Sequence, residues 1–446
     1  MFHVKHSLPH ILLINPWITD FAAYNFWIKP FGLLSIGSLL RRNGFRITLL
    51  DCLDSTIKTK SYGDGKLPKV KIHKPPALKG IPRHFSQYGI SESEFLDRLA
   101  CIERPDVVAI TSGMTYWYPG VITVIDIINK LYKNAPVVLG GIYATLCYDH
   151  AIKYSGADYV FNGRDENEAL RAISNLAGLE AGSSDFRYSQ STDGNKPHPA
   201  FDLYTHPDYV CISTSRGCPF KCPYCAASFL SGSFVRRDPL DAVEEIEYWA
   251  MQQGVRNIAF YDDALLVNPE ASIIPMLKEI IRRRISINLH APNGLHTGEI
   301  DGELADLMHK GGFKTVRLGF ETSDEAMQIE TGGKVDNRAF ERAVRHLNRA
   351  GYSAQEIGVY ILAGLPGQRV EEVEESIAFV MGTGARPILT EYSPIPHTQF
   401  FEKAKHFSKL DIGKEPLYHN NSIFPCQWEG FTWEDLRRLK ENLQTR

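Results

Sequence analysis

The sequence predicts an α/β protein with a doubly wound, Rossmann-like domain at 1–182, a partial (β/α)6 TIM-like barrel at 208–399 and a short mixed C-terminal extension at 400–446. Two observations predict this organisation. Short apolar runs alternate with amphipathic segments along most of the 446 residues, as they do when helices cover a parallel sheet. The alternation stops before residue 208, in a stretch rich in Ser, Asp, Gly and Pro, so 183–207 is predicted to be a linker.

The first part begins with "HILLINPW", a short apolar run that ends at Asn-Pro and suits a buried parallel strand. Four further strands are predicted after it, and the helices between them show apolar residues at helical spacing. The strands are 10–17, 46–52, 106–114, 136–141 and 158–163, and the helices are 30–45, 120–134, 144–156 and 166–178.

One segment of this part breaks the pattern. Residues 58–90 are rich in Lys, Pro and Gly and are too many for an ordinary connection. A solvated surface insertion is one interpretation. A lid or a substrate-contacting loop is the other, because the segment follows the carboxyl end of a strand, where α/β proteins bind ligands.

The second part begins with a strand at 208–218 and continues with five more strand and helix pairs. Its other strands are predicted at 257–263, 287–293, 315–322, 356–364 and 387–395, with helices at 239–253, 271–283, 301–311, 336–350 and 370–382. A short charged helix is expected near the C-terminus.

Composition excludes several classes of function. The net charge is −3 and the sequence pI is about 6.6, so there is no basic excess of the kind that nucleic-acid binding requires. No apolar run is long enough for a membrane span, and the N-terminal "ILLI" is too short for a signal peptide. We therefore expect a cytoplasmic protein without nucleic-acid or membrane partners. Cys426 is expected to be a packing residue rather than a catalytic one.

Cys218, Cys222 and Cys225 form a C-x3-C-x2-C pattern on a loop with Gly217 and Pro223. Soft thiolates suit zinc or an iron–sulfur cluster. Structural zinc takes four protein ligands, and His198 or His206 could supply the fourth. A [4Fe–4S] cluster held by three cysteines instead keeps one iron open for a substrate or cofactor. The loop follows the first barrel strand, where barrel enzymes place their chemistry, and this favours the open cluster.

"RGCPFKCPYC" resembles the signature of the radical S-adenosylmethionine (SAM) superfamily, and later segments resemble further motifs of that family. They are "FYDDALL", "LGFET", "ILAGLPGQ" and "EYSPIPHT", in the family's order. The resemblance implies that the three cysteines bind the cluster, that the open iron chelates SAM, and that reductive cleavage gives a 5′-deoxyadenosyl radical. It also implies SAM contacts, at Tyr224, Asp262, Asp263, Glu321, Gly364, Ser393 and Pro394. His397 departs from the family pattern, which has Gly there.

The first part carries glycines at strand ends, where a ligand can approach the backbone. "PVVLGGIYAT", "DYVFNGRDENEAL" and "AITSGMTYWYPG" resemble the cobalamin-binding domain that precedes the barrel in class B radical SAM enzymes. Asp-x-His-x-x-Gly, which supplies a cobalt ligand in many cobalamin domains, is absent. The resemblance implies a cobalamin site, with contacts from Thr111, Ser112, Tyr116, Gly140, Gly141 and Gly163.

These resemblances imply a cobalamin-dependent radical SAM enzyme that methylates an unactivated carbon. The alternatives are a rearrangement or cyclisation without methyl transfer, a radical SAM enzyme with an empty first domain, and a zinc-binding structural module. The implied partners are an electron donor such as flavodoxin or ferredoxin and a small-molecule, peptide or lipid substrate. Substrate specificity is expected to lie in 58–90 and 400–446, which depart from the shared scaffold.

Overall fold

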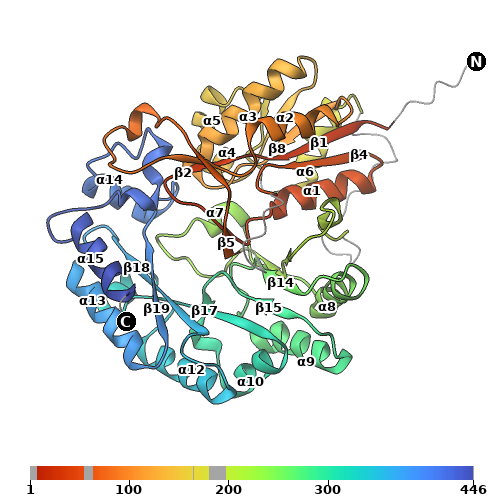
Figure 1. The fold of residues 1–446 in the computed structure, drawn as a ribbon. Coiled ribbons are helices and arrows are strands. Elements are labelled where there is room, and N and C mark those ends of the chain that lie inside the picture. The colour runs from red at the N-terminus through yellow and green to blue at the C-terminus, as the bar shows by residue number, and fades with distance from the viewer. Residues whose placement is uncertain (1–7, 55–63, 164, 180–196, 445–446) are drawn as a thin grey trace, which may run out of the picture. The chain divides into compact units, whose positions relative to one another are not determined.

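The computed structural model describes residues 8–54, 64–163, 165–179 and 197–444. The chain divides into two compact units, Met1–Pro207 and Asp208–Arg446, here called unit 1 and unit 2. Each unit is described by itself (Figure 1). Among the described residues, no helix has the length and apolar composition that a membrane span requires.

Unit 1 is built on a parallel sheet with strand order β10-β9-β8-β1-β4. Its strands are β1 His10–Asn15, β4 Arg46–Asp51, β8 Val107–Ile110, β9 Val137–Leu139 and β10 Tyr159–Val160. The chain winds outward in opposite directions from β1, to β4 on one side and to β8 on the other. The carboxyl ends of β1 and β8 therefore form a switch point, where open α/β sheets bind ligands.

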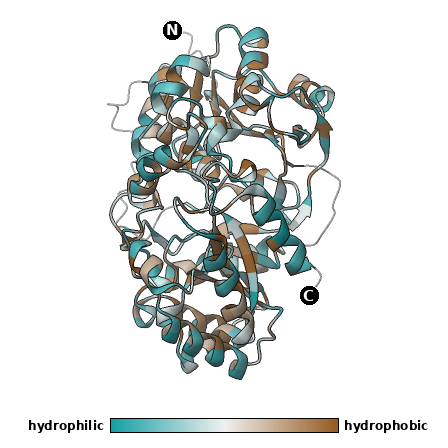
Figure 2. Cartoon of the chain, turned by 90° about the vertical axis from the view of Figure 1, so that its left-hand side faces the viewer, coloured by the Kyte–Doolittle hydropathy of each residue, from teal (hydrophilic) through white to brown (hydrophobic). Residues whose placement is uncertain are grey.

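Both faces of this sheet are covered. Alternate residues of β1 belong to two different buried clusters, with Leu12 and Ile14 in one and Ile11 and Leu13 in the other. In Figure 2 the helices carry both hydrophilic and hydrophobic residues, as helices that cover a sheet with one face do. The predicted doubly wound fold is thus confirmed. The helices are α1 Phe31–Arg42, α2 Glu92–Ala100, α3 Tyr118–Leu131, α4 Ile142–Leu146, α5 Tyr148–Tyr154 and α6 Glu166–Leu176.

Two helices of unit 1 differ from the sequence prediction. The helix predicted at 144–156 is two helices, α4 and α5, because Cys147 leaves the helical backbone conformation at φ −124° and ψ 46°. α2 was not predicted. Its start is nevertheless marked in the sequence, since Ser91 caps it by accepting from the Glu94 N–H.

The segment 58–90 is structured from residue 64 onward, and 58–63 lie outside the described residues. β2, β7 and β6 form an antiparallel sheet, and β3 pairs with β5. Leu67, Leu78, Phe85 and Tyr88 are buried, so this part is not merely a solvated loop. The strands are β2 Ile18–Asp20, β3 Tyr24–Phe26, β5 Asp64–Lys66, β6 Lys69–Lys71 and β7 Ser86–Tyr88.

The end of the predicted linker packs onto unit 1, whereas its residues 183–196 lie outside the described part. Ala200 and Phe201 are buried. Asp202 makes a bidentate pair with Arg41, and the Tyr204 hydroxyl donates to Asp51 Oδ2 at 2.5 Å. Residues 200–204 are therefore part of the unit 1 fold and not free chain.

Unit 2 is an open parallel sheet with strand order β11-β14-β15-β17-β18-β19, which agrees with the predicted six-stranded partial barrel. β16 pairs with the second half of β17, and the short antiparallel pair β12–β13 follows β11. The strands are β11 Val210–Ile212, β12 Ser215–Arg216, β13 Val235–Arg236, β14 Asn257–Phe260, β15 Asn288–His290, β16 Leu295–His296, β17 Phe313–Glu321, β18 Ile357–Ala363 and β19 Arg386–Glu391.

Helices connect these strands and cover the outside of the sheet (Figure 1). The helix predicted at 239–253 is α8 followed by a π-helical turn at Tyr248–Gln252. α7, α11 and α14 were not predicted. The helices are α7 Ala227–Ser231, α8 Pro239–Glu247, α9 Ile273–Arg283, α10 Gly302–Lys310, α11 Glu325–Glu330, α12 Asn337–Ala350, α13 Val370–Gly382, α14 Gln399–Phe407 and α15 Trp433–Gln444.

Candidate active site

The three-cysteine loop lies just beyond the carboxyl end of β11. Gly217 permits the turn into it, because φ is +77° and a Cβ there would lie 3.0 Å from the Ser233 carbonyl oxygen. The Cys225 N–H donates to the Cys222 carbonyl at 3.0 Å, and the Ala227 N–H donates to Cys225 Sγ at 3.4 Å. Burial raises the pKa of the Cys218 and Cys225 thiols above the usual value. Backbone hydrogen bonds within the loop thus contribute to its shape, and its three thiols are its candidate cluster ligands.

Tyr224 ties this loop to β17 through a polar triad in which Glu321 is buried and Tyr224 and Lys334 are half-buried. Its hydroxyl donates to Glu321 Oε1 at 2.9 Å, and Lys334 Nζ donates to the same oxygen at 2.7 Å and to the Tyr224 hydroxyl at 3.0 Å. Burial and the Glu321 charge raise the pKa of Tyr224. Burial opposes the charge on Lys334, but Glu321 and Cys222 outweigh it, so the pKa of the ammonium is raised. A cation is therefore fixed beside the cysteine loop.

The backbone around this triad is unusual. Glu321 has φ +70°, and the β17–β18 register shifts between Gly319 and Glu321. Gly332 has φ +114° and packs against the cysteine loop, since a Cβ there would lie 3.3 Å from Cys222 Cα. A strained non-glycine backbone next to three thiols is the pattern that functional sites show.

The adjacent carboxylates Asp262 and Asp263 have different surroundings. Asp262 is 3% exposed and accepts the Thr214 N–H at 3.0 Å, the Thr214 hydroxyl at 2.7 Å and the Ser215 hydroxyl at 2.7 Å. Asp263 is exposed and accepts only from the Ser231 hydroxyl, at 3.4 Å. Burial raises the pKa of the Asp262 carboxyl group. Asp262 thus fixes the chain that leads into the cysteine loop, while Asp263 stays open to a ligand.

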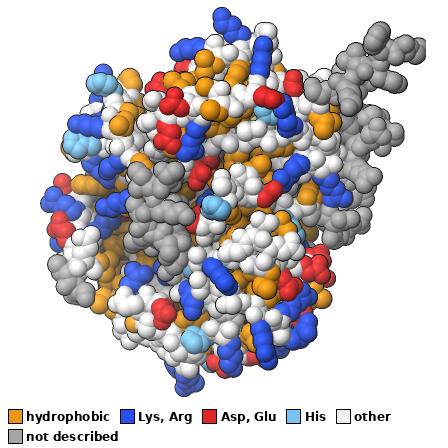
Figure 3. Space-filling view, turned by 45° about the vertical axis from the view of Figure 1, so that its right-hand side comes forward, with side chains coloured by type: hydrophobic (Ala, Val, Ile, Leu, Met, Phe, Trp, Pro, Cys, Tyr) orange, Lys and Arg blue, Asp and Glu red, His pale blue; other side chains and the backbone are white. Residues whose placement is uncertain are grey.

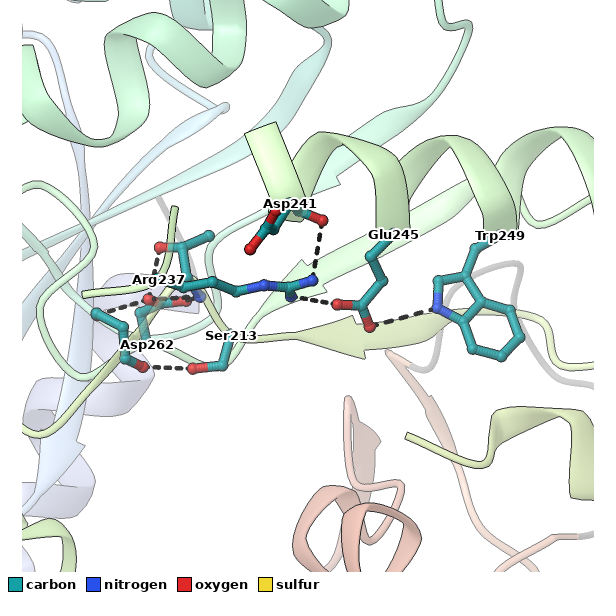
Figure 4. A network of polar contacts seen from close by, with 8 residues as sticks. Ser213, Arg237, Asp241, Glu245, Trp249 and Asp262 are labelled. Carbon is teal, nitrogen blue, oxygen red and sulfur yellow. Dashed lines mark hydrogen bonds and ion pairs between the residues drawn. The ribbon is translucent and has the colours of Figure 1, made fainter. Parts of the chain in front are cut away.

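A polar network extends from this chain to α8 (Figure 4). The Arg237 N–H donates to the Thr214 carbonyl at 2.9 Å, and its guanidinium pairs with Glu245 and donates to the Asp241 carbonyl at 2.9 Å. Glu245 also accepts from Trp249 Nε1 at 3.5 Å. The network connects the chain that leads into the cysteine loop to α8.

The glycine motif after β18 is packed by the C-terminal extension. Gly364 has φ +86°, and a Cβ there would lie 2.2 Å from the Phe424 ring. Its N–H donates to Gln368 Oε1 at 2.8 Å. The Phe424 ring therefore packs directly against Gly364. Buried Cys426, with a pKa raised to about 12 by burial, belongs to an apolar cluster with Leu365 and Phe400, which agrees with a packing role.

The last predicted SAM contacts follow β19. The Ser393 hydroxyl donates to the His419 carbonyl at 2.5 Å, and Pro394 is buried. His397, which stands where the family pattern has Gly, adopts φ +66° and stacks on Phe229 with ring centroids 4.1 Å apart. Phe229 lies on α7, directly after the third cysteine. The residue that departs from the pattern thus keeps the glycine-type backbone and adds a contact to the cysteine region.

In unit 1 three of the predicted cobalamin contacts meet at the ends of β8 and β9. The Ser112 hydroxyl donates to the Gly140 carbonyl at 2.6 Å, and the Ile142 N–H donates to the Ser112 carbonyl at 2.8 Å. Gly141 has φ +95° and would place a Cβ 2.3 Å from the Ser112 carbonyl oxygen. A Cβ at Gly140 would meet no atom within 4 Å. Gly141 is therefore required by the fold, whereas Gly140 leaves open space.

The other predicted cobalamin contacts are less open. Thr111 is half-buried, and its N–H donates to the Ile14 carbonyl at 3.1 Å at the switch point. Tyr116 is 6% exposed and packs edge-on against Trp117. The space beside Gly163 is already occupied, since a Cβ there would lie 2.3 Å from the Phe161 ring and 2.8 Å from Glu168 Oε2.

Sequence reasoning missed Lys334 and Thr214, which hold the loop. "TGGK" carries a signal for Lys334, because paired glycines allow a close backbone approach. Among the described residues, no group of three His, Cys, Asp or Glu side chains is arranged to hold a single metal ion. His198 and His206, considered for zinc, belong to unit 1.

Comparison with known families gives two matches. The radical SAM superfamily model matches residues 212–380, and the B12 binding domain model matches residues 85–173. These matches confirm the predicted pair of domains and the predicted cofactors, a [4Fe–4S] cluster, SAM and cobalamin.

Individual proteins are similar at low identity. An uncharacterized methyltransferase of Pyrococcus horikoshii is 26% identical over 74% of this chain and 73% of its own length. The anaerobic magnesium-protoporphyrin IX monomethyl ester cyclase of Synechocystis is 24% identical over 69% of this chain and 60% of its own length. Among solved structures, the radical SAM methyltransferase TsrM from Kitasatospora setae has a TM-score of 0.65 at 18% identity, covering 90% of this chain and 78% of that one. The last likeness shows that the two chains share a fold.

Proposed function

We propose that the chain is a cobalamin-binding radical SAM enzyme that methylates an unactivated carbon, because a match to the B12 binding domain model precedes a match to the radical SAM superfamily model. The observation that carries the proposal is the three-cysteine loop at the carboxyl end of β11, combined in one chain with an open cobalamin-type switch point. The methyltransferase from Pyrococcus horikoshii supports the reaction type.

The residues of unit 2 have separable tasks in this proposal. Cys218, Cys222 and Cys225 hold the cluster, and when bound, the cluster, SAM and cobalamin supply a 5′-deoxyadenosyl radical and a transferable methyl group. The Tyr224–Lys334–Glu321 triad fixes the loop and places a cation beside the thiols. Asp263, unlike Asp262, has free acceptor capacity for SAM. Glu321 already accepts two hydrogen bonds on one oxygen, so we propose that its other oxygen is the one that contacts SAM.

In unit 1 we propose that cobalamin binds over the carboxyl ends of β8 and β9. Gly140 leaves the space above the end of β9 open, and Thr111 presents a half-buried side chain at the end of β8. Both ends belong to the edge of the sheet where doubly wound folds bind cofactors. The unit would orient cobalamin and exclude water from one of its faces.

A rearrangement or cyclisation without methyl transfer is the second candidate. It is favoured by the likeness to the magnesium-protoporphyrin ester cyclase, which spans 69% of this chain. Both candidates use the same cofactors, and the product distinguishes them, because only methyl transfer adds a CH2 to the substrate. The substrate is a small molecule, a peptide or a lipid, and the electron donor is a protein such as flavodoxin or ferredoxin.

The first test is a metal assay on anaerobically purified protein, produced with cobalamin and reconstituted with iron and sulfide. We expect about four irons and about one cobalt per chain after desalting, as one cubane cluster and one corrinoid require. Iron without cobalt would remove the methyltransferase proposal and leave a radical SAM enzyme whose first domain binds something else. Protein that contained no iron and no sulfide would exclude both candidates.

A further inference from the structure

α12 carries a stripe of four arginines on its exposed face. Arg338, Arg342, Arg345 and Arg349 are spaced by four, three and four residues, which places them within an arc of about 60° on an α-helix. All four side chains are exposed. Over the described residues, none of them makes an ion pair with a carboxylate. The opposite face of α12 is buried through Phe340, Val344 and Leu347, so the orientation of the stripe toward solvent is fixed.

The stripe is not explained by the stability of α12. Successive arginines lie three or four residues apart, where like charges repel on a helix surface. Arg338 lies in the first turn, where the helix dipole disfavours a cation. Glu341 is the one acidic residue of the helix. The whole chain has a net charge of −3, so this concentration of positive charge is local.

The surface around the stripe is hollowed on both sides. A groove of about 510 Å3 is lined by Arg345, Arg349 and Glu341 from α12 and by Gly382 and Thr383 from the end of α13. A second hollow, of about 430 Å3, is lined by Arg342 and His346 of α12 on one side and by residues after β14 and β16 on the other, among them the carboxylates of Glu270, Glu299 and Asp301. Figure 3 shows Lys and Arg side chains at the lower edge of the face it presents, the edge where α10 and α12 lie in Figure 1. The stripe thus forms a ridge between two recesses.

The ridge begins close to the cysteine loop. Gly332 packs on Cys222, and Lys334 donates to Tyr224 of the same loop. Arg338 follows Lys334 by four residues, which is at most about 14 Å of chain. A protein bound along the start of α12 is therefore near the group that the cysteines hold.

We propose that the α12 arginine ridge is the docking surface for a small acidic electron-transfer protein that reduces the iron–sulfur cluster. Redox encounters of this kind are small, weak and electrostatically steered, so a charged ridge suits them better than an apolar face would. The inference rests on the cluster part of the proposed function and is independent of cobalamin and of the reaction product.

The test uses cluster-reconstituted protein and flavodoxin as the acidic probe. The dissociation constant of oxidised flavodoxin is measured first, and then the rate at which reduced flavodoxin reduces the cluster, followed by its visible absorption. The charge-reversal variant R338E/R342E/R345E/R349E is expected to bind about tenfold or more weakly and to be reduced correspondingly slowly at low salt. At about 1 M salt, where the screening length is about 3 Å, the difference should disappear.

Three controls make the result specific. R338K/R342K/R345K/R349K keeps the charge and should bind flavodoxin like the wild type. K66E/K69E/K71E/K79E makes the same charge change on exposed lysines of unit 1 and should have little effect. Dithionite needs no docking surface, so it should reduce the cluster of every variant at the wild-type rate, which also shows that the fold and cluster are intact.

The proposal would be overturned if R338E/R342E/R345E/R349E bound flavodoxin as tightly as the wild type does. It would also be overturned if K66E/K69E/K71E/K79E lost as much flavodoxin affinity, because the effect would then come from the net charge and not from the ridge. Protein that holds iron but no cobalt would contradict the methyltransferase function alone and leave the docking result valid.

Discussion

At the scale of single residues, the adjacent carboxylates of Asp262 and Asp263 separate the shaping of the loop from ligand contact. The Asp262 carboxylate accepts from Thr214 and Ser215, which begin the chain into the cysteine loop. An asparagine amide at this position keeps one acceptor oxygen but places an NH2 donor against the donors of Thr214 and Ser215. We therefore expect Asp262→Asn to lower the free energy of unfolding by about 1–3 kcal/mol and to reduce iron retained after desalting.

Asp263→Asn is the matched control, because the same chemical change is made one residue away on an exposed side chain. It should retain iron and stability and, if Asp263 contacts SAM, should weaken SAM binding measured by calorimetry. Equal iron loss in the two variants would contradict the assignment of Asp262 as the positioning residue.

His290 is a buried titratable group that makes unit 2 sensitive to acid. It contacts Thr315 Oγ1 at 2.9 Å and Asn257 Oδ1 at 3.3 Å, and burial, with smaller contributions from Arg317 and Lys314, lowers its pKa to about 4. Its ordinary pKa is about 6.5. Below pH 6.5 the unfolded chain therefore binds a proton that the folded chain does not, and stability falls until the pH passes about 4.

The expected loss from this one group is about 2 kcal/mol between pH 7 and pH 5. It is measured as the difference in pH slope of the free energy of unfolding between the wild type and His290→Asn, which cannot titrate. Asn lowers stability at every pH, so only the slope reports on the proton. Parallel slopes would show that His290 takes up its proton equally in both states.

At the scale of elements, the C-terminal extension is part of the barrel wall. Gly364 lets β18 turn beneath Phe424, and the Trp428 indole N–H donates to the Gln368 carbonyl at 2.9 Å. The Phe400 N–H, at the start of α14, donates to the Pro223 carbonyl of the cysteine loop at 3.0 Å. The extension thus supports the loop from one side while β17 supports it from another.

Gly364→Ala tests this packing. The new Cβ meets Phe424 and must adopt φ +86°, so we expect unfolding to be easier by about 2–4 kcal/mol, with loss of bound iron. Adding Phe424→Ala should restore little, since the φ strain remains and a cavity is created. Gly382→Ala, at the end of α13 with no atom within 4 Å, is the control and should be neutral or slightly stabilising. Similar losses in both alanine variants would contradict this account.

The sequence predicted those elements whose pattern is local. "HILLINPW" and "EIGVYILAG" read as buried strands because parallel strands are apolar on both faces. The sheet formed by β2, β7 and β6 could not be predicted, because β2 pairs with a strand about 70 residues away and the exposed lysines of β6 obscure the few buried positions.

The same limit applies to the site. The three cysteines and Gly140-Gly141 are contiguous patterns and were found. Lys334 was not, because its contact with Tyr224 spans 110 residues, and the two glycines before it indicate a close backbone approach without naming the partner. The packing of Phe424 against Gly364 also depends on a segment 60 residues away.

At the scale of the whole molecule, the two units place the candidate cofactor sites on separate cores. The cysteine loop and every side chain that holds it belong to unit 2, whereas the switch point of β1 and β8 belongs to unit 1. Each site is therefore expected to form without the other, and iron and cobalt content should report on the two units separately.

If the two sites form independently, a variant can lose one cofactor and keep the other. Cys218→Ala/Cys222→Ala/Cys225→Ala should lose its iron and keep wild-type cobalamin affinity, measured by absorption after desalting. Gly140→Val should keep its iron and its thermal midpoint, because the new side chain meets open space, yet bind cobalamin about tenfold more weakly if the ligand fills that space. Gly141→Val is the contrasting control, since its Cβ would collide with the Ser112 backbone and should destabilise unit 1 itself.

Loss of cobalamin in the cysteine variant would mean that the sites are coupled, and unchanged affinity in Gly140→Val would move the corrinoid away from the end of β9.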